Sequence, residues 1–280
     1  LKHETLIEEI EYLDLPAVVK CNVAYTGMGF ATWVFRDRSY REVLPNVQKA
    51  ALAYDKTALF YTERFISGPE ISAHFLCNGR EWVFMGAARD YKKIRDGDQG
   101  INTSGAGTYA PSEHWTPDIE RQVFGYMDKL MPYLGMLGLE YRGILYLGLM
   151  IDEDGTAQVI EINTRPGGPE FQTLMKTMDN SNLLENLYRA ADGDDLLPIA
   201  FNGKSAVSVT VMNKQYSPSW KLEAQMPNMV NLPQDIELSK SSHLSGSNNT
   251  FGVLTTQADN REQAADKIYN YLRGINCKDD

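Results

Sequence analysis

Apolar and polar residues alternate over several short stretches of the chain, and this pattern predicts strands. Stretches rich in β-branched and aromatic residues, with turn residues on either side, are typical of strands in a sheet. Asn78-Gly79 separates two of these stretches and is a residue pair that two-residue hairpins favour. Residues 16–35 predict a further hairpin with its tip near residues 25–29. The other predicted strands cover residues 58–66, 70–76, 81–88, 143–151 and 158–163.

Apolar residues at helical spacing predict helices between these strands. One of them has a clear start, because Thr116 is a good N-cap and Pro117 suits the first helical position. Pro132 is expected to kink or end this helix. The run Asn260-Arg261-Glu262-Gln263 resembles a capping box and opens the last helix. The predicted helices cover residues 4–13, 37–54, 116–134 and the residues that follow Asn260.

Residues 89–111 have neither kind of periodicity. A polar and glycine-rich run of this kind predicts a loop, and so long a loop in a compact domain is usually functional. It contains Asp90, Lys92 and Asp98, followed by the small residues Thr103-Ser104-Gly105. Opposite charges beside a glycine-rich segment can bind a zwitterionic or phosphorylated substrate closely. The alternative is a solvated surface loop without a ligand.

The stretch VIEINTRPGGPE, residues 159–170, places polar side chains on an apolar strand. Side chains alternate between the faces of a strand, so Glu161 and Asn163 point to the same side, about 7 Å apart. Two such oxygen donors can hold Mg²⁺ ions that bridge phosphates. Arg165 follows and can bind a phosphate or a carboxylate through two parallel hydrogen bonds. The alternative is an edge strand that ends in a turn.

Lys20 ends another apolar strand, just before a predicted tip that contains Gly27 and Gly29. A lysine at this place can contact nucleotide phosphates as a point charge. Backbone N–H groups in a glycine-rich tip can also approach a phosphate. The alternative is a surface lysine beside an ordinary hairpin.

Composition excludes several classes of protein. A chain of 280 residues is long enough for two domains, and its formal net charge of −10 gives no basic surface for nonspecific nucleic-acid binding. Cys21, Cys77 and Cys277 lie far apart in the sequence, as is typical of reduced cytoplasmic thiols. No apolar run approaches the length of a membrane span, and the charged start shows no secretory signal. Because the first residue is not Met, we expect a fragment or a processed product, located in the cytoplasm.

Two long motifs, taken together and in order, resemble the phosphoribosylamine–glycine ligase family, whose members are ATP-grasp enzymes of purine synthesis. The first motif reads AARDYKKIRDGDQGINTSGAGTYAP and covers residues 87–111. The second reads YRGILYLGLM and, after a turn, VIEINTRPGGPEFQ, ending at residue 172. The similarity runs from about Val18 to Thr173. Near the end of the chain, FGVLTTQADNREQAADKIYNYL is similar to the closing strand and helix of the family.

This resemblance implies an α+β protein with the ATP-grasp fold, in which two α+β subdomains clasp the nucleotide, and a small C-terminal α/β domain. We expect residues 1–67 to form the small nucleotide-clasping subdomain, incomplete at its N-terminus. Residues 68–197 are expected to form the core with the substrate loop and the metal site, and residues 198–280 the C-terminal domain. The N-terminal domain of the family is not within this sequence. A homodimer or a separate chain that supplies this domain is therefore an expected partner.

The implied activity is that of an ATP-dependent, ADP-forming carbon–nitrogen ligase. ATP first phosphorylates a carboxylate, and an amine then attacks the acyl phosphate to form an amide. Such chemistry requires positioning and neutralisation of charge more than a protein nucleophile. The implied cofactors are ATP and Mg²⁺ or Mn²⁺. The expected acid is glycine or another small amino acid, and the amine is a phosphoribosylamine, a nucleotide or a modified nucleobase, with no membrane partner.

The resemblance also implies a role for individual residues. Those that match the ATP-binding positions are Lys20, Glu63, Phe65 and Glu70. The expected substrate-binding residues are Asp90, Asp98, Asn102, Thr103 and Gly105. Glu161 and Asn163 match the metal-holding pair. The expected catalytic residues are Arg165, Asn102 and Lys92.

The chain departs from the family pattern at several of its motifs. Asn22 replaces an aspartate, Met28 replaces a lysine and Gly168 replaces an acid. These changes favour an altered substrate. They also leave open a catalytically inactive nucleotide-binding module or a partner subunit. A purely structural protein is a weaker alternative, because a scaffold has no need of Glu161 or Asn163.

Overall fold

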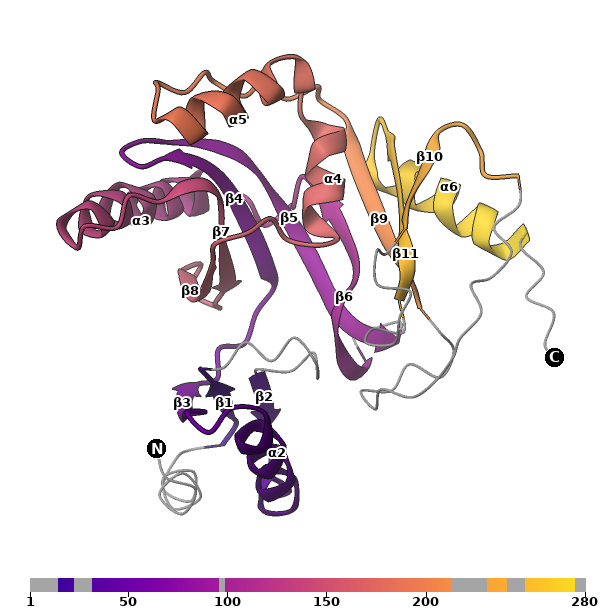
Figure 1. Cartoon of the computed structure of the whole chain (residues 1–280). Coiled ribbons are helices and arrows are strands. Elements are labelled where there is room, and N and C mark those ends of the chain that lie inside the picture. The colour runs from indigo at the N-terminus through magenta and orange to yellow at the C-terminus, as the bar shows by residue number, and fades with distance from the viewer. Residues whose placement is uncertain (1–14, 23–31, 96–98, 213–230, 241–249, 275–280) are drawn as a thin grey trace. The chain divides into compact units, whose positions relative to one another are not determined.

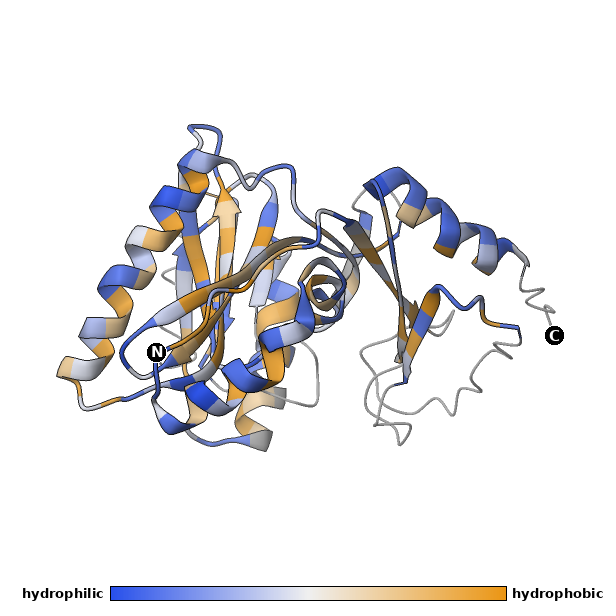
Figure 2. Cartoon of the chain, turned by 90° about the horizontal axis from the view of Figure 1, so that it is seen from above, coloured by the Kyte–Doolittle hydropathy of each residue, from blue (hydrophilic) through white to orange (hydrophobic). Residues whose placement is uncertain are grey.

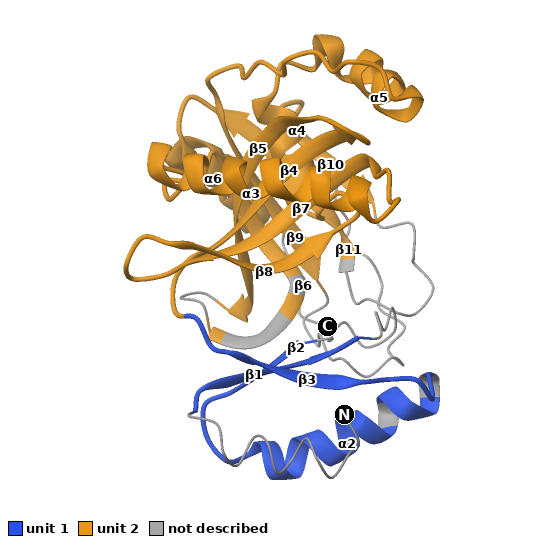
Figure 3. Ribbon diagram, turned by 90° about the vertical axis from the view of Figure 1, so that its left-hand side faces the viewer, with its two compact units in different colours: residues 1–66, 216–223, 243–248 blue, residues 67–215, 224–242, 249–280 orange. Residues whose placement is uncertain are grey.

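The computed structural model describes residues 15–22, 32–95, 99–212, 231–240 and 250–274. The described chain forms two compact units, coloured separately in Figure 3. The first unit contains the described residues up to Ile66, and the second contains those from Ser67 onward. Each unit has its own sheet. The helix predicted over residues 4–13 and the hairpin tip near residues 25–29 lie outside the described residues.

The first unit is a three-stranded antiparallel sheet with one helix. Strand β1 lies between β2 and β3. Tyr40 and Leu44 of the helix are buried against Val19 and Phe60 of the sheet. The apolar spacing of the helix is therefore explained by its packing on one face of the sheet. The elements are β1 (Ala17–Cys21), β2 (Thr32–Phe35), α2 (Tyr40–Tyr54) and β3 (Phe60–Arg64).

The second unit is built on an eight-stranded sheet in the order β10-β11-β9-β6-β5-β4-β7-β8 (Figure 1). Neighbouring strands are antiparallel throughout. The strands are β4 (Glu70–Asn78), β5 (Trp82–Arg95), β6 (Gln99–Ala110), β7 (Arg142–Ile151), β8 (Ala157–Asn163), β9 (Ser205–Met212), β10 (Ile236–Lys240) and β11 (Thr250–Ala258). We expected a separate domain from residue 198 onward. In the structure, β9, β10 and β11 extend the sheet of the second unit.

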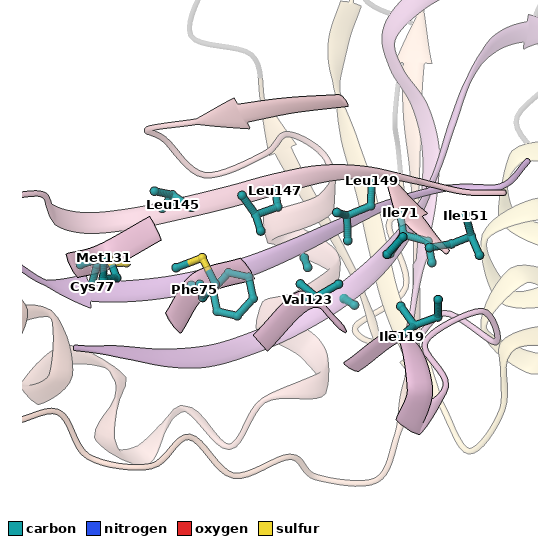
Figure 4. Packing of buried hydrophobic residues seen from close by; sticks show 14 residues of the cluster. Ile71, Phe75, Cys77, Ile119, Val123, Met131, Leu145, Leu147, Leu149 and Ile151 are labelled. Atoms are coloured by element: carbon teal, nitrogen blue, oxygen red, sulfur yellow. The ribbon is translucent and has the colours of Figure 1, made fainter. Parts of the chain in front are cut away.

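Helix α3 (Pro117–Met136) packs on β4, β5 and β7 through the largest apolar cluster. Figure 4 shows Val123 of the helix beside Phe75 and Leu147 of the strands. Thr116 caps the helix, since its hydroxyl accepts a hydrogen bond from the N–H of Ile119 at 3.3 Å. We expected Pro132 to kink or end this helix, and the structure shows that the helix does not end there but continues to Met136.

A second apolar cluster joins α4 (Glu170–Thr177) and α5 (Leu183–Asp192) to the sheet, and the short 3-10 helix η1 (Asn180–Asn182) connects the two helices. Leu76, Met85 and Leu174 are fully buried in it. The last helix, α6 (Arg261–Gly274), packs near β9 and β11 around Leu254 and Ile268. Figure 2 shows the apolar stretches gathered in the strands and hydrophilic residues along the outer sides of the helices.

The predicted strands and helices within the described residues are present. One segment that was predicted as a loop differs. Residues 89–111 were expected to form a loop, but they contain the second half of β5 and all of β6. Their polar and glycine-rich composition is explained by the site they carry, described below. Within the described residues, no helix is long and apolar enough to cross a membrane.

Candidate active site

Lys92 lies among carboxylates on neighbouring strands of the second unit. Its ammonium forms an ion pair with Glu70 of β4 and lies 3.9 Å from the Oδ2 atom of Asp90 on its own strand. Burial opposes its charge, but the negative charges of Glu70, Asp90 and Glu161 raise the pKa of Lys92 above its usual range. Lys92 therefore remains protonated and holds one positive charge at this place. The structure thus brings together three residues to which the family resemblance gave separate roles, namely Glu70, Lys92 and Asp90.

Two carboxyl groups at the site are almost completely buried. The side chain of Asp90 is 1% exposed, and neither of its oxygens accepts a hydrogen bond from the described residues. Glu170, at the start of α4, is also buried, and its Oε2 atom has no hydrogen-bond partner among these residues. Burial raises the pKa of Asp90, and the charge of Glu170 raises it further. Burial likewise raises the pKa of Glu170. The Oε1 atom of Glu170 accepts a hydrogen bond from the hydroxyl of Ser72 at 3.4 Å, so the oxygens without a donor are its Oε2 atom and both oxygens of Asp90. These buried oxygens favour a proton-donating or cationic group of a ligand.

Glu161 and Asn163 lie on the same face of β8, as the strand alternation predicts. They pair with Gly148 and Tyr146 of β7, respectively. The hydroxyl of Tyr146 donates a hydrogen bond to the Oε1 atom of Glu161 at 3.2 Å. A Cβ atom at position 148 would lie 2.6 Å from the Cγ atom of Glu161. The glycine therefore makes room for this carboxylate on the surface of the sheet. Because β8 is an edge strand, Ile162 on its other face is 51% exposed.

The residues at this place fit a divalent ion that is shared with phosphates. Glu161 offers carboxylate oxygens and Asn163 offers its amide oxygen, while the buried Nδ2 atom of Asn163 has no hydrogen-bond partner among the described residues and can donate to a ligand oxygen. Mg²⁺ is commonly held by one or two side-chain oxygens together with substrate phosphates and water. No cluster of three or more His, Cys, Asp or Glu side chains suited to a metal occurs in the described part of the chain. The pair therefore suits an ion that arrives with a nucleotide more than a permanent metal centre.

The turn after β8 is fixed by a buried histidine. The N–H of Gly167 donates a hydrogen bond to the Nε2 atom of His74 at 3.1 Å. Burial lowers the pKa of His74 to about 3, so that the ring is neutral and can accept this bond. The ring also stacks on Tyr146 with 4.9 Å between the ring centroids. Arg165 is exposed, with its guanidinium carbon 5.7 Å from the centroid of the Tyr146 ring. Its side chain is therefore available to an anionic ligand at the rim of the site.

Strand β6 contributes the small residues of the site. The hydroxyl of Thr103 donates to the carbonyl oxygen of Lys92 at 2.9 Å and accepts from the N–H of Gly105 at 3.2 Å. A Cβ atom at position 105 would lie 2.5 Å from the Cδ atom of Pro169, so this glycine allows β6 to approach the start of α4. The backbone of Asn102 pairs with Lys93. The side chain of Asn102 and the whole of Asp98 lie outside the described residues.

The first unit holds three of the expected ATP-binding residues. Lys20 of β1 is largely buried and forms an ion pair of 2.7 Å with Glu63 of β3. Phe65 follows β3, and the guanidinium carbon of Arg36 lies 4.7 Å from the centroid of its ring. Both contacts lie within the first unit.

Sequence reasoning missed several residues that shape the site. Glu170 lies within the quoted motif, but only its burial beside Asp90 indicates a role. Tyr146 and Gly148 are two positions apart in YRGILYLGLM, so on a strand they face the same side of the sheet. His74 was expected to be structural, which agrees with its hydrogen bond to the turn.

Comparison with known proteins gives a consistent result. Residues 3–171 match the family model of the phosphoribosylglycinamide synthetase ATP-grasp (A) domain. A phosphoribosylamine–glycine ligase from Ralstonia nicotianae is 31% identical over 245 residues, which cover 86% of this chain and 56% of that protein. The chain therefore spans about half of the length of this curated relative.

Solved structures share the fold. The phosphoribosylamine–glycine ligase from Thermotoga maritima has a TM-score of 0.73 and 24% sequence identity, covering 97% of this chain and 68% of that one. An N5-carboxyaminoimidazole ribonucleotide synthetase, solved as an ADP complex, has a TM-score of 0.67 and 18% identity, covering 96% and 64%. These similarities show that the fold is ATP-grasp, as the sequence resemblance implies.

Proposed function

Because the chain belongs to the phosphoribosylglycinamide synthetase family through its ATP-grasp domain, we propose that it is an ATP-dependent, ADP-forming ligase that joins a carboxylate to an amine. The observation that carries the proposal is the set of charged groups on one region of the sheet. Glu161 and Asn163 face the same side of β8, and the charge of Glu161 acts on Lys92 between Glu70 and Asp90. This arrangement can neutralise phosphates and orient two small substrates.

The reaction proceeds in two steps, formation of an acyl phosphate and its attack by the amine. A carboxylate oxygen of the acid attacks the terminal phosphorus of ATP, the bond to the bridging oxygen breaks, and ADP leaves. The amine nitrogen then attacks the carbonyl carbon of the acyl phosphate, the bond to the phosphate oxygen breaks, and the nitrogen loses a proton. A divalent ion held by Glu161 and Asn163 would supply positive charge beside the phosphates.

The residues of the chain provide positioning and charge for these steps. Lys92 and Arg165 are cations that can stabilise the charge on the phosphoryl group as it is transferred. Asp90 and Glu170 are buried acids that can hold the amino group of a substrate. We assign the acid substrate to glycine or another small amino acid, because an ammonium group close to the reacting carboxylate matches this charge pattern. The amine is a phosphoribosylamine or another nucleotide-like amine.

The central test is release of ADP. The protein is incubated with ATP and Mg²⁺, with each acid of a panel of small amino acids, and with each of several amines. ADP release that requires both an acid and an amine supports the ligase. Measurable ATP binding without ADP release for any pair would support the second candidate, an inactive nucleotide-binding module, which the change to Gly168 in the family motif favours.

A substitution tests the assignment of Glu161. In Glu161→Gln, ADP release should fall by at least about 100-fold. Loss of a residue that only orients a metal ligand already costs about 10- to 100-fold, and loss of the ligand itself should cost more. The thermal unfolding temperature should change little, since the side chain lies on the surface of the sheet and not in a core. Glu153→Gln, in the exposed turn before β8, is the matched control and should keep full activity. Activity retained in Glu161→Gln would refute the assignment.

A further inference from the structure

A cavity of about 300 Å³ lies in the second unit and shares no residue with the candidate active site. It is formed where β6 ends. Strand β6 pairs with β5 from Arg89 onward, so no strand of the described residues pairs with that edge of β5 before Ala87. The cavity occupies this gap, with Phe84 of β5 on one side and Leu174 of α4 on another. A cavity of this size is large enough for a small organic ligand.

Three aromatic rings line the cavity. Phe84 and Trp115 stack with 4.9 Å between their centroids and an angle of 10° between their planes. The ring of Phe201 lies 6.0 Å from that of Phe84, and this residue is 47% exposed. The faces of aromatic rings carry partial negative charge and therefore attract cations.

A carboxylate completes the lining. The Oε2 atom of Glu120 accepts a hydrogen bond from the Nε1 atom of Trp115 at 3.0 Å. Among the described residues, no cation forms an ion pair with Glu120. Lys204 also lines the cavity, but its charge is compensated by an ion pair with Asp259. The charge that remains beside the aromatic rings is therefore negative.

We propose that this cavity binds an organic cation, of the substituted ammonium class. The aromatic rings provide cation–π contacts and exclude water, and Glu120 provides the opposite charge. A neutral molecule of the same shape fills the same volume but gains neither interaction. The binding of a cation in preference to its neutral isostere is therefore the property that defines the site.

Choline and 3,3-dimethyl-1-butanol form a suitable pair of probes, because they have nearly the same shape and differ in charge. Binding to the full chain is measured by calorimetry and by quenching of tryptophan fluorescence. Choline should bind at least about tenfold more tightly than the alcohol, as expected from a cation–π contact together with a carboxylate. Equal affinity for the two probes, or no binding of either, would overturn the proposal.

Variants locate the binding. Trp115→Phe should remove the fluorescence response while calorimetry still detects choline. Glu120→Gln should reduce the affinity for choline towards that for the alcohol and leave the affinity for the alcohol unchanged. Phe201→Leu should weaken choline binding several-fold. Tyr188→Leu removes an aromatic residue that is 68% exposed on α5 and does not line the cavity, so it should leave both affinities unchanged. A preference for choline that survives Glu120→Gln and Phe201→Leu would place the binding elsewhere and refute the site.

Discussion

At the scale of single residues, the position of one carboxylate depends on the absence of a side chain opposite it. Glu161 pairs with Gly148 across β7 and β8, and any Cβ atom at 148 would overlap its Cγ atom. The hydroxyl of Tyr146 then holds the Oε1 atom. The missing side chain at Gly148 therefore leaves room for Glu161, and the hydroxyl of Tyr146 holds its carboxylate by a hydrogen bond. This arrangement restricts the rotamers that Glu161 can adopt.

The substitution Gly148→Ala tests this restriction. The added methyl group should push Glu161 from its place, and activity should fall by about 10-fold or more, because small displacements of reacting groups cost about that much. ADP release and circular dichroism are measured together. Gly125→Ala in α3 is the matched control, since no atom lies within 4 Å of its added Cβ, and it should keep activity. Unchanged activity in Gly148→Ala would show that Glu161 tolerates displacement.

At the scale of elements, a chain of buried hydroxyl groups joins α4 to three strands. Thr108 of β6, Ser208 of β9 and Thr255 of β11 lie opposite one another in the sheet. Thr173 of α4 hydrogen bonds to Thr108 and donates to Ser208 at 2.6 Å, and Ser208 is 2.8 Å from Thr255. These hydrogen-bonded hydroxyl groups orient α4, which begins at Glu170, on β6, the strand that contains Thr103 and Gly105.

Breaking this chain should loosen the helix. Thr173→Val is isosteric, so it removes the hydrogen bonds without leaving a large cavity, and the free energy of unfolding should fall by about 1–3 kcal/mol. Urea unfolding measures this change. Thr108→Val and the double variant complete a cycle, in which the two losses should not add, because the residues share one bond. Strict additivity would show that the two hydroxyls act independently.

The elements also show what could be read from the sequence. Strands with β-branched alternation, such as β8, and the capped helix α3 were predicted because their local signals agree with their burial. The 89–111 segment was predicted as a loop, since one face of β5 and β6 carries charged and small residues in place of apolar ones. The two family motifs led us to propose Glu161, Lys92 and Asp90 as site residues. The burial of Glu170 depends on a contact between α4 and distant strands, so no local pattern indicated it.

At the scale of the whole molecule, the two units have separate cores. Leu44 is fully buried in the cluster of the first unit, and Leu147 is buried in a cluster of the second. The residues of each cluster come from one unit only. Stability is therefore expected to be distributed between two cooperative regions, and a single unfolding free energy does not describe the chain.

Two matched substitutions test this division. Leu44→Ala should destabilise its own unit by about 2–5 kcal/mol through the cavity that it leaves. Hydrogen exchange followed by mass spectrometry should show lost protection in β1, α2 and β3 and unchanged protection in β4 and β7. Leu147→Ala should give the reverse pattern. Loss of protection in both units after either change would mean that they unfold together.

The pairing of β6 with β9 has a consequence for any shortened form of the protein. Residues Gly107–Ala110 of β6 pair with residues Ala206–Val209 of β9, which come much later in the sequence. A polypeptide cut after residue 171 would leave β6 with an unpaired edge, and such edges recruit strands from other molecules. Truncation at that point is expected to cause aggregation. Strand β9 therefore protects the edge of β6, the strand that contains Thr103 and Gly105, from pairing with other molecules.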